Sequence, residues 1–472
     1  MSTLKIISNT IYYGVIPKLS LLISIVILPL TTPYLTTFDY GITGVVSSYT
    51  GFIACVAPLG LNLHLTNSFY EMPKNYNLVW GRVLFYYILS GFIFGLVSVV
   101  VLCLSLPFDS VMSLFLASVL GSVPIFLFSN VNLAQHLFPL LAKPKPLVFI
   151  NLFASCCSIL VSFVMVYFFK LGFWGMLTGT AVGAVLAYVV FIKEIWFRYE
   201  ILPICKVKIH RLKAMLKSSL PLVPHTLGFV LLSSSSRIVM NVYGVDYNEI
   251  GLFSHGSTMG DYIVVVTTAL TTALVPQMQM SYRQSDYDKF RKLYYLCQGV
   301  ALISSFLVCV WMKEIYSFLI HNEELKQSET IATVMCFSQV LMPLYTFMSI
   351  SAFVERKTGQ LLWLVFIPGF LNLIICGLFI PTYGYSVAIY STLISFWSQI
   401  LMPVLIPYFR EKTSLWLGNK VKLVVILFLS LGLLYLGNFI SDSSYMLKCM
   451  VSFVFVAVSV ILFYKQRFYQ IL

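Results

Sequence analysis

Charged residues and recognisable catalytic motifs are both scarce in this sequence. Charged residues make up 10% and hydrophobic residues 59% of the 472 residues, whereas soluble domains carry roughly 25% charged residues. A water-soluble fold is therefore excluded. The sequence also lacks a phosphate-binding glycine loop, a nucleophile elbow, zinc-ligand spacing and paired carboxylates at the end of an apolar segment. We therefore predict no enzymatic activity, no catalytic residue and no cofactor.

The ten cysteines show no CxxC spacing, and most of them lie inside apolar segments. Small, weakly polar thiols in such segments are typical packing residues, so we predict neither a metal site nor a disulfide framework. The first apolar segment resembles a signal peptide, but it is too long, contains Lys18 and lacks a small-residue cleavage site. We expect it to be retained in the protein.

Long apolar segments fill most of the chain. A helix needs about 20 apolar residues to cross a bilayer, and only a helix or a closed barrel satisfies its own backbone there. We predict an all-α polytopic membrane protein with about fourteen crossings. The predicted crossings are 6–30, 42–65, 83–104, 111–133, 147–169, 171–192, 220–240, 250–275, 293–310, 331–353, 361–380, 387–406, 423–440 and 445–464.

The net charge of +13 raises the possibility of nucleic-acid binding, so the positions of the 30 Lys and Arg residues decide the matter. Of these, 24 fall in alternate loops on one predicted face, four on the other face and two within crossings. Cytoplasmic loops of membrane proteins are enriched in Lys and Arg. We therefore predict a lipid bilayer and no nucleic acid as the partner, with both termini in the cytoplasm.

The chain also contains an internal repeat. The stretch Asp39-Tyr40-Gly41-Ile42 after crossing one is echoed 210 residues later by Glu249-Ile250-Gly251-Leu252 after crossing seven. Six crossings return the chain to the same side, so the two copies run parallel, an arrangement that transporters use to hold substrate near the midplane. We predict two six-helix lobes around a central cavity, at 1–200 and 201–415, followed by two further helices at 416–472.

Three charged residues lie within the crossings: Lys18, Arg237 and Asp261. Each costs roughly 2.5–3.5 kcal/mol near a helix centre. Asp261 shares a helical face with Ser254 and Thr258, a polar stripe that predicts a water-lined site where Asp261 binds a proton or Na+. A structural ion pair between Lys18 and Asp261 is the alternative interpretation.

The two cations suit an anionic cargo. Arg237 shares a helix face with Ser233, and its guanidinium fork fits a phosphate. His225 lies early in the same crossing. We predict that Lys18, Arg237, His225 and Ser233 bind substrate; a snorkelling Arg237 and a hydrogen-bonded structural His225 are the alternatives.

Several short motifs resemble the bacterial polysaccharide flippases, the Wzx-type O-antigen translocases of the MOP exporter superfamily. These motifs are Leu28-Pro29-Leu30-Thr31-Thr32, Phe38-Asp39-Tyr40-Gly41, Leu59-Gly60-Leu61, Phe69-Tyr70-Glu71, Leu220-Pro221-Leu222-Val223-Pro224-His225, Ser233-Ser234-Ser235-Ser236-Arg237 and Ile250-Gly251-Leu252-Phe253-Ser254. The chain departs from the family pattern at Pro33, Ser68 and Ser236, where the family often carries charged residues.

The resemblance implies transport of undecaprenyl-pyrophosphate-linked oligosaccharide, an O-antigen or other surface polysaccharide repeat unit, to the periplasmic leaflet by alternating access. It implies a location in the bacterial inner membrane, coupling to an ion gradient or the membrane potential, and a polysaccharide polymerase and chain-length regulator as partners. The alternatives are a cation-coupled multidrug transporter or lipid II-type flippase of the same superfamily, a membrane-embedded polymerase or glycosyltransferase, and a scaffold without transport activity.

Overall fold

The computed structural model describes residues 19–72, 75–205, 209–220, 223–355, 357, 359–417 and 421–465. The described residues form helices and no strand, which confirms the predicted all-α fold. Their contacts divide the chain into two compact units, Met1–Gly251 and Leu252–Leu472. The first unit includes the crossing that contains Arg237. The predicted lobes, which follow the sequence repeat, place this crossing in the second lobe. The lobe boundaries remain a prediction.

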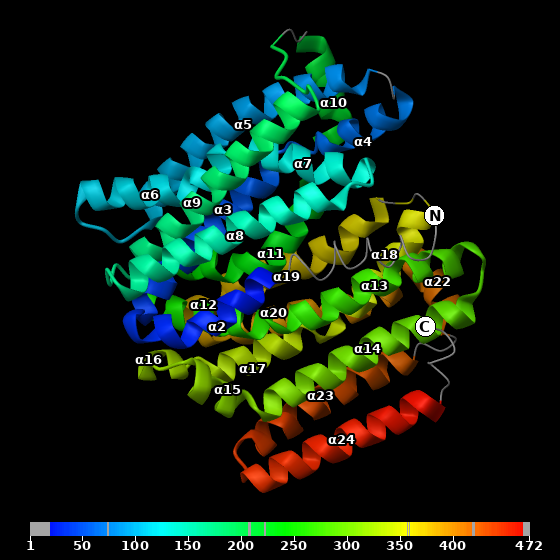
Figure 1. Ribbon diagram of the computed structural model, residues 1–472. Helices are drawn as coiled ribbons and strands as arrows, with labels where there is room; N and C mark the ends of the chain where they lie inside the picture. Colours follow the sequence, from blue (N-terminus) through cyan, green and yellow to red (C-terminus); the bar gives the residue numbers. More distant parts are fainter. Residues whose placement is uncertain are drawn as a thin grey trace. The chain divides into compact units, whose positions relative to one another are not determined.

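The first unit is a bundle of helices (Figure 1). Its elements are α2 (Leu19–Thr31), η2 (Thr32–Tyr34), α3 (Thr37–Val56), α4 (Asn62–Glu71), α5 (Tyr76–Ser105), α6 (Val111–Phe126), α7 (Phe128–Leu140), α8 (Pro144–Tyr167), α9 (Phe173–Ile192), η3 (Lys193–Arg198), α10 (Ile209–Ser219) and α11 (Val223–Val242), and α12 (Tyr247–Asp261) begins here.

The second unit contains the remaining helices, with α14, α23 and α24 running alongside one another (Figure 1). Its elements are α13 (Ile263–Arg283), α14 (Tyr287–Val310), α15 (Met312–Leu319), α16 (Glu323–Lys326), α17 (Glu329–Ser338), η5 (Gln339–Leu341), α18 (Met342–Val354), α19 (Gly359–Tyr383), α20 (Ser386–Ser398), η6 (Gln399–Leu401), α21 (Met402–Leu405), α22 (Pro407–Leu417), α23 (Val421–Ser441) and α24 (Tyr445–Lys465).

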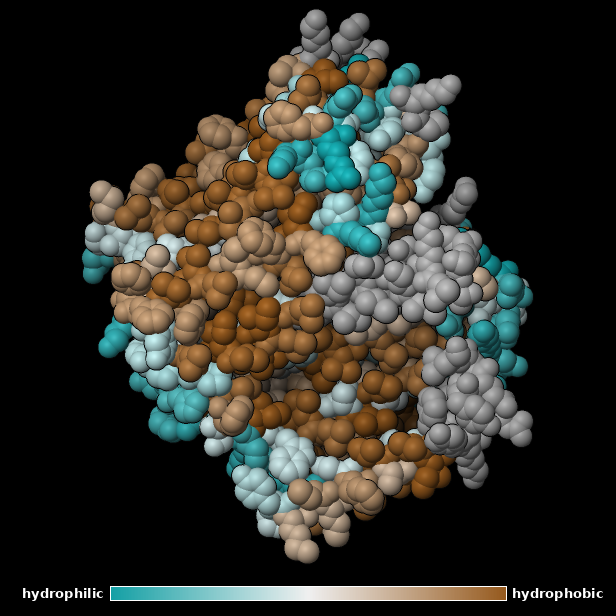
Figure 2. Space-filling view, in the orientation of Figure 1, coloured by the Kyte–Doolittle hydropathy of each residue, from teal (hydrophilic) through white to brown (hydrophobic). Residues whose placement is uncertain are grey.

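Ten segments of the described chain are long and apolar enough to cross a membrane, and Leu19–Tyr34 and Tyr445–Ile461 are shorter apolar helices. The 20-residue helices α3 and α11 occupy the two remaining predicted crossings. Apolar side chains cover much of the visible face in Figure 2, while hydrophilic residues gather toward its margins. This distribution is expected where lipid replaces water around the middle of the helices.

One feature differs from the sequence prediction: crossing eight is not one continuous helix, because α12 ends at Asp261 and α13 begins at Ile263. The basic segment after crossing six contains the amphipathic helix α10, whose Leu212, Met215 and Leu216 pack on the apolar core of the first unit.

Asp39, in the Phe38-Asp39-Tyr40-Gly41 motif, joins the starts of two helices. Its carboxylate accepts hydrogen bonds from the backbone N–H of Thr36 and from that of Phe173, both at 2.7 Å, so it caps α3 and holds the first residue of α9. Gly172 has a φ of +52°, and a Cβ there would overlap the Asp39 carboxylate. The motif is therefore a structural joint.

Gly41 and Gly251, which match in the predicted repeat, each lie against the helix that carries the other within the first unit. A Cβ on Gly41 would overlap the backbone oxygen of Tyr247, and one on Gly251 would overlap that of Thr37. The Thr37 hydroxyl also donates to the Asn248 side-chain oxygen at 2.7 Å. The start of α12 can approach α3 this closely only because both positions lack a side chain.

The carboxylate of Glu355 links three helix ends of the second unit. Glu355, just after α18, accepts hydrogen bonds from the hydroxyls of Tyr282 at 2.5 Å and Tyr408 at 3.0 Å, and it pairs with the Lys412 ammonium at 2.6 Å. Partial burial raises the pKa of Glu355, but the hydrogen bonds from Lys412, Tyr282 and Tyr408 outweigh it and hold this pKa below its usual range.

We expect Gly41→Ala to destabilise the protein, because the added methyl group has no space at the α3–α12 contact; overpacking of this kind costs about 1–3 kcal/mol. The matched control is Gly51→Ala in the same helix, where a Cβ meets no atom within 4 Å. Thermal unfolding of the purified protein in detergent measures both. Equal unfolding temperatures for the two variants would contradict the close packing.

We expect Glu355 to make stability pH-dependent. Because its pKa is lower in the folded protein than in the unfolded chain, its contribution is present above the unfolded value and is lost as the pH falls through the folded value. Glu355→Gln should reduce the loss of unfolding temperature between pH 7 and acidic pH. Glu411→Gln, at an exposed position on α22, is the control and should follow the wild type.

Candidate functional site

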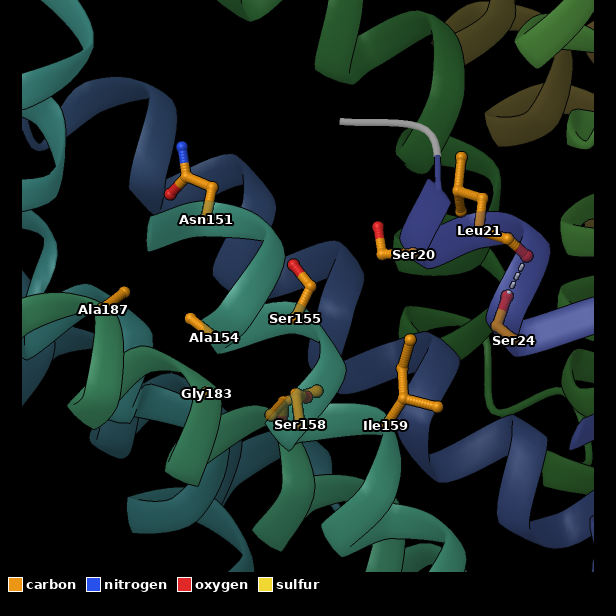
Figure 3. A pocket seen from close by; sticks show the side chains of 11 residues that line it. Ser20, Leu21, Ser24, Asn151, Ala154, Ser155, Ser158, Ile159, Gly183 and Ala187 are labelled. Atoms are coloured by element: carbon orange, nitrogen blue, oxygen red, sulfur yellow. Dashed lines mark hydrogen bonds between the residues drawn. The ribbon is translucent and has the colours of Figure 1, made fainter. Parts of the chain in front are cut away.

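A cavity of about 430 Å³ opens between α2, α8 and α9 in the first unit (Figure 3). Its lining residues are Ser20, Leu21, Ser24, Asn151, Ala154, Ser155, Ser158, Ile159, Thr180, Gly183 and Ala187. The volume lies within the range of small-molecule binding sites. Sequence reasoning singled out none of these residues as a site.

Small residues bring α8 and α9 together on one side of this cavity. A Cβ on Gly179 would overlap the Ser162 hydroxyl, and one on Gly183 would lie 2.8 Å from the Cβ of Ser158. The two helices therefore pack along a glycine and serine seam, as small residues permit in membranes. Bulkier residues at these positions would push α9 away and change the shape of the cavity.

The predicted cation-containing site falls on α11 in the first unit. Arg237 is partly buried, and Ser233 is exposed with its hydroxyl donating to the Phe229 carbonyl at 3.0 Å. The ring of His225 lies 5.7 Å from that of Phe229, and its buried Nε2 has no hydrogen-bond partner among the described residues. Lys18, predicted to act with them, lies outside the described residues.

The predicted ion-coupling residues fall on α12 in the second unit. Ser254 is buried, whereas Thr258 and Asp261 are exposed, so the predicted stripe turns from the protein interior to its surface along the helix. Asp261 is the last residue of α12, at the break before α13. Its Oδ1 accepts a hydrogen bond from the Gln339 side-chain N–H at 3.1 Å. The carboxylate therefore lies within the apolar segment Tyr247–Arg283, at an irregular point of the backbone.

Gln339 belongs to a duplicated motif that sequence reasoning missed. The hexapeptide Ser-Gln-Val-Leu-Met-Pro at 338–343 recurs as Ser-Gln-Ile-Leu-Met-Pro at 398–403. Each copy ends a helix, forms the 3-10 turn η5 or η6, and starts a new helix with proline in its first turn. Proline lacks an N–H and cannot donate to the carbonyl four residues earlier. A search for repeats shorter than a whole lobe would have found this motif.

At the first break, neighbouring side chains donate hydrogen bonds to the backbone carbonyls. The Gln298 amide donates to the Val340 carbonyl and the Trp397 indole to the Phe337 carbonyl, both at 2.9 Å. In the second break, Gln399 is fully buried, and neither of its amide atoms has a hydrogen-bond partner among the described residues. The two copies therefore share a backbone form, but only the first is linked to a carboxylate.

The described residues contain no group of three or more His, Cys, Asp or Glu side chains that could hold a metal ion. The polar features considered for a site are a cation on α11, a carboxylate on α12 and the cavity beside α8. Polar groups at membrane depth typically mark binding sites or pathways.

Solved membrane transporters share this fold. A lipid II flippase, MurJ, in an inward-closed conformation matches with a TM-score of 0.71 over 95% of this chain and 99% of that chain, at 13% identity. An inward-facing multidrug resistance MATE family transporter of the MOP superfamily matches with a TM-score of 0.61 over 89% of this chain and 100% of that chain, also at 13% identity. At this identity the likeness shows the fold alone. No curated protein sequence matches the chain.

The chain therefore has the fold of polytopic membrane transporters. The family model described as "Polysaccharide biosynthesis protein" matches residues 34–317. Because this match covers more than half of the sequence, the chain belongs to that family. The resemblance drawn from the short sequence motifs is thereby confirmed.

We expect Gln339→Leu to destabilise the protein more than Gln399→Leu. The first change removes the hydrogen bond to Asp261, which costs on the order of 1 kcal/mol, whereas the second removes a buried amide without a described partner. Thermal unfolding of both variants in detergent measures the difference. Gln399→Leu should be neutral or stabilising; an equal loss in both variants would contradict the asymmetry.

Proposed function

We propose that the protein flips undecaprenyl-pyrophosphate-linked oligosaccharide, an O-antigen or other surface polysaccharide repeat unit, from the cytoplasmic to the periplasmic leaflet. The observation that carries this proposal is the family match to polysaccharide biosynthesis proteins in a chain with a transporter fold. The solved flippase MurJ, which has the same fold, is a flippase of lipid II.

The proposed location is the inner membrane of a bacterium, with both termini cytoplasmic. The distribution of Lys and Arg among alternate loops supports this orientation. A polysaccharide polymerase and a chain-length regulator are the proposed protein partners, since they would consume the flipped repeat unit.

The pyrophosphate of the cargo needs cationic or N–H donors during the crossing. We assign this role to Lys18 and Arg237, with Ser233 one turn before Arg237 on α11 and His225 about 18 Å away near the start of that helix. Arg237 and Ser233 are four residues apart on one helical face, and the exposed Ser233 hydroxyl still has acceptor capacity. The cargo would pass by alternating access of the two lobes.

Energy would enter through Asp261, the proposed site for a proton or Na+. Its carboxylate is exposed at the end of α12 next to Thr258, and the Gln339 amide orients one of its oxygens. The buried Ser254 hydroxyl lies seven residues earlier on the same face and would join the site only if α12 moved. When an ionisable group beside a helix break is neutralised, the backbone at the break can change its conformation.

Flipping in reconstituted vesicles tests these assignments. We expect Lys18→Ala combined with Arg237→Ala to slow flipping of the lipid-linked oligosaccharide at least about tenfold, because each lost charge-assisted contact is worth roughly 1.5–3 kcal/mol. Asp261→Asn should abolish dependence on a proton or Na+ gradient. Asp288→Asn, an exposed carboxylate near the start of α14, is the control. Unchanged flipping in the double variant would remove the cation assignment.

The fold of the MATE transporters favours one alternative, export of cationic drugs coupled to cations. A vesicle assay with a fluorescent organic cation separates the two functions. Uptake of the cation that depends on Asp261, together with no flipping of the lipid-linked sugar, would replace the proposed function by this alternative.

A further inference from the structure

The described lining of the cavity between α2, α8 and α9 is uncharged. It differs in this from the proposed pyrophosphate-binding residues, which include Lys18 and Arg237. Of its eleven lining residues, six carry a hydroxyl or an amide group, and none of these described residues is charged. The six are Ser20, Ser24, Asn151, Ser155, Ser158 and Thr180. The remaining lining is small or aliphatic.

Three of the polar groups come from one face of α8. Asn151, Ser155 and Ser158 are spaced four and three residues apart, which places them on the same side of the helix. Figure 3 shows Asn151 and Ser155 projecting from α8 beside the cavity, with Ser20 and Ser24 on α2 across from them. All three α8 residues are partly exposed.

These α8 side chains are available to a ligand. Serines in membrane helices commonly donate back to the carbonyl four residues earlier, as Ser118 and Ser122 do in α6. No hydrogen bond within the described residues involves the side chains of Asn151, Ser155 or Ser158. On the opposite wall, the Ser24 hydroxyl donates to the Leu21 carbonyl at 2.7 Å.

The lining discriminates between the parts of a lipid-linked sugar. Among the described lining residues, a pyrophosphate would find no cation and a cationic drug no carboxylate. An acyl or prenyl chain would leave the hydroxyls unpaired. A neutral sugar presents hydroxyls that both donate and accept, together with C–H faces that fit Leu21, Ile159 and Ala154.

One end of the cavity lies toward the cytoplasmic side of the first unit. Asn151 is seven residues after Pro144, the first residue of α8, which is about 10 Å along the helix. Ala187 lies near the C-terminal end of α9, shortly before the basic segment that starts at Lys193. The charge distribution assigns the loops at both of these helix ends to the cytoplasm, and the lining extends from there to Ile159 and Thr180, near the middle of α8 and α9.

We propose that this cavity receives neutral sugar residues of the cargo, while the pyrophosphate is bound elsewhere. This inference rests on the proposed function, since it names the part of the lipid-linked oligosaccharide that the cavity recognises. Selection among sugar repeat units would then depend on the α8 face, independently of the lipid carrier.

Equilibrium binding to the purified full-length protein tests the proposal with two probes. One is the lipid-linked oligosaccharide isolated from source cells, and the other is undecaprenyl pyrophosphate without sugar. We expect the wild type to prefer the sugar-bearing probe. Asn151→Ala combined with Ser155→Ala should reduce its affinity about tenfold or more, as the loss of two hydrogen bonds implies, and leave the affinity for the bare carrier within about twofold.

A filling variant and a matched control guard against misfolding. Ser155→Phe should occupy the cavity and remove the preference for sugar, whereas Leu160→Phe, at a position 53% exposed on the same helix, should keep it. Thermal unfolding checks each variant, and a variant that unfolds early is replaced by Ser158→Ala in the same binding assay.

Each result has a defined meaning. A wild type that binds both probes equally, or an alanine variant that keeps the preference, overturns the sugar assignment but leaves flipping intact. Equal weakening of both probes by Ser155→Phe assigns the cavity to the lipid chain and also overturns it. A wild type that binds neither probe and flips neither in vesicles overturns the proposed function, and the inference that rests on it.

Discussion

Within a bilayer the backbone has no water to bond, so each N–H and C=O group must find a partner inside the protein. This constraint explains why the described chain is helical and why departures from regular helix are informative. The break at Asp261 and the 3-10 turns at Gln339 and Gln399 all lie inside apolar segments. At the first turn, the Gln298 amide and the Trp397 indole provide the missing donors. The irregular backbone persists there because other helices of the second unit hold polar side chains against it.

The same constraint shapes the first unit by a different means. Polar joints lie at helix ends, where Asp39 caps α3 and binds the start of α9. Between the ends, contact depends on small residues, as at Gly41 and Gly251 and along the seam of α8 and α9. Without a hydrophobic driving force between helices in lipid, this close approach provides much of the packing. The cavity exists where the seam ends and α2 lines the remaining side.

Charged and neutral polar groups are segregated in a way that matches a cargo of mixed chemistry. A lipid-linked oligosaccharide has an anionic pyrophosphate, a neutral sugar chain and an apolar tail. The cation on α11 and the uncharged cavity beside α8 would recognise different parts of such a molecule. In the proposed function Asp261 belongs to neither site, because a carboxylate repels a pyrophosphate, and it would bind the coupling ion instead. Separate sites for cargo and ion are what an ion-driven transporter requires.

The sequence by itself determined the helical, membrane-spanning architecture and the family, since crossing length, loop charge and short motifs are local properties of the chain. It also marked Arg237 and Asp261, because a charge in an apolar segment is visible without coordinates. It could not show that Asp39 joins two helices, that Gly41 and Gly251 meet α12 and α3, or that Gln339 reaches Asp261 across 78 residues. Only the tertiary structure decided these, and it alone revealed the cavity: Ser155 or Asn151 looks like any polar residue in a membrane helix until packing shows that it lines a cavity.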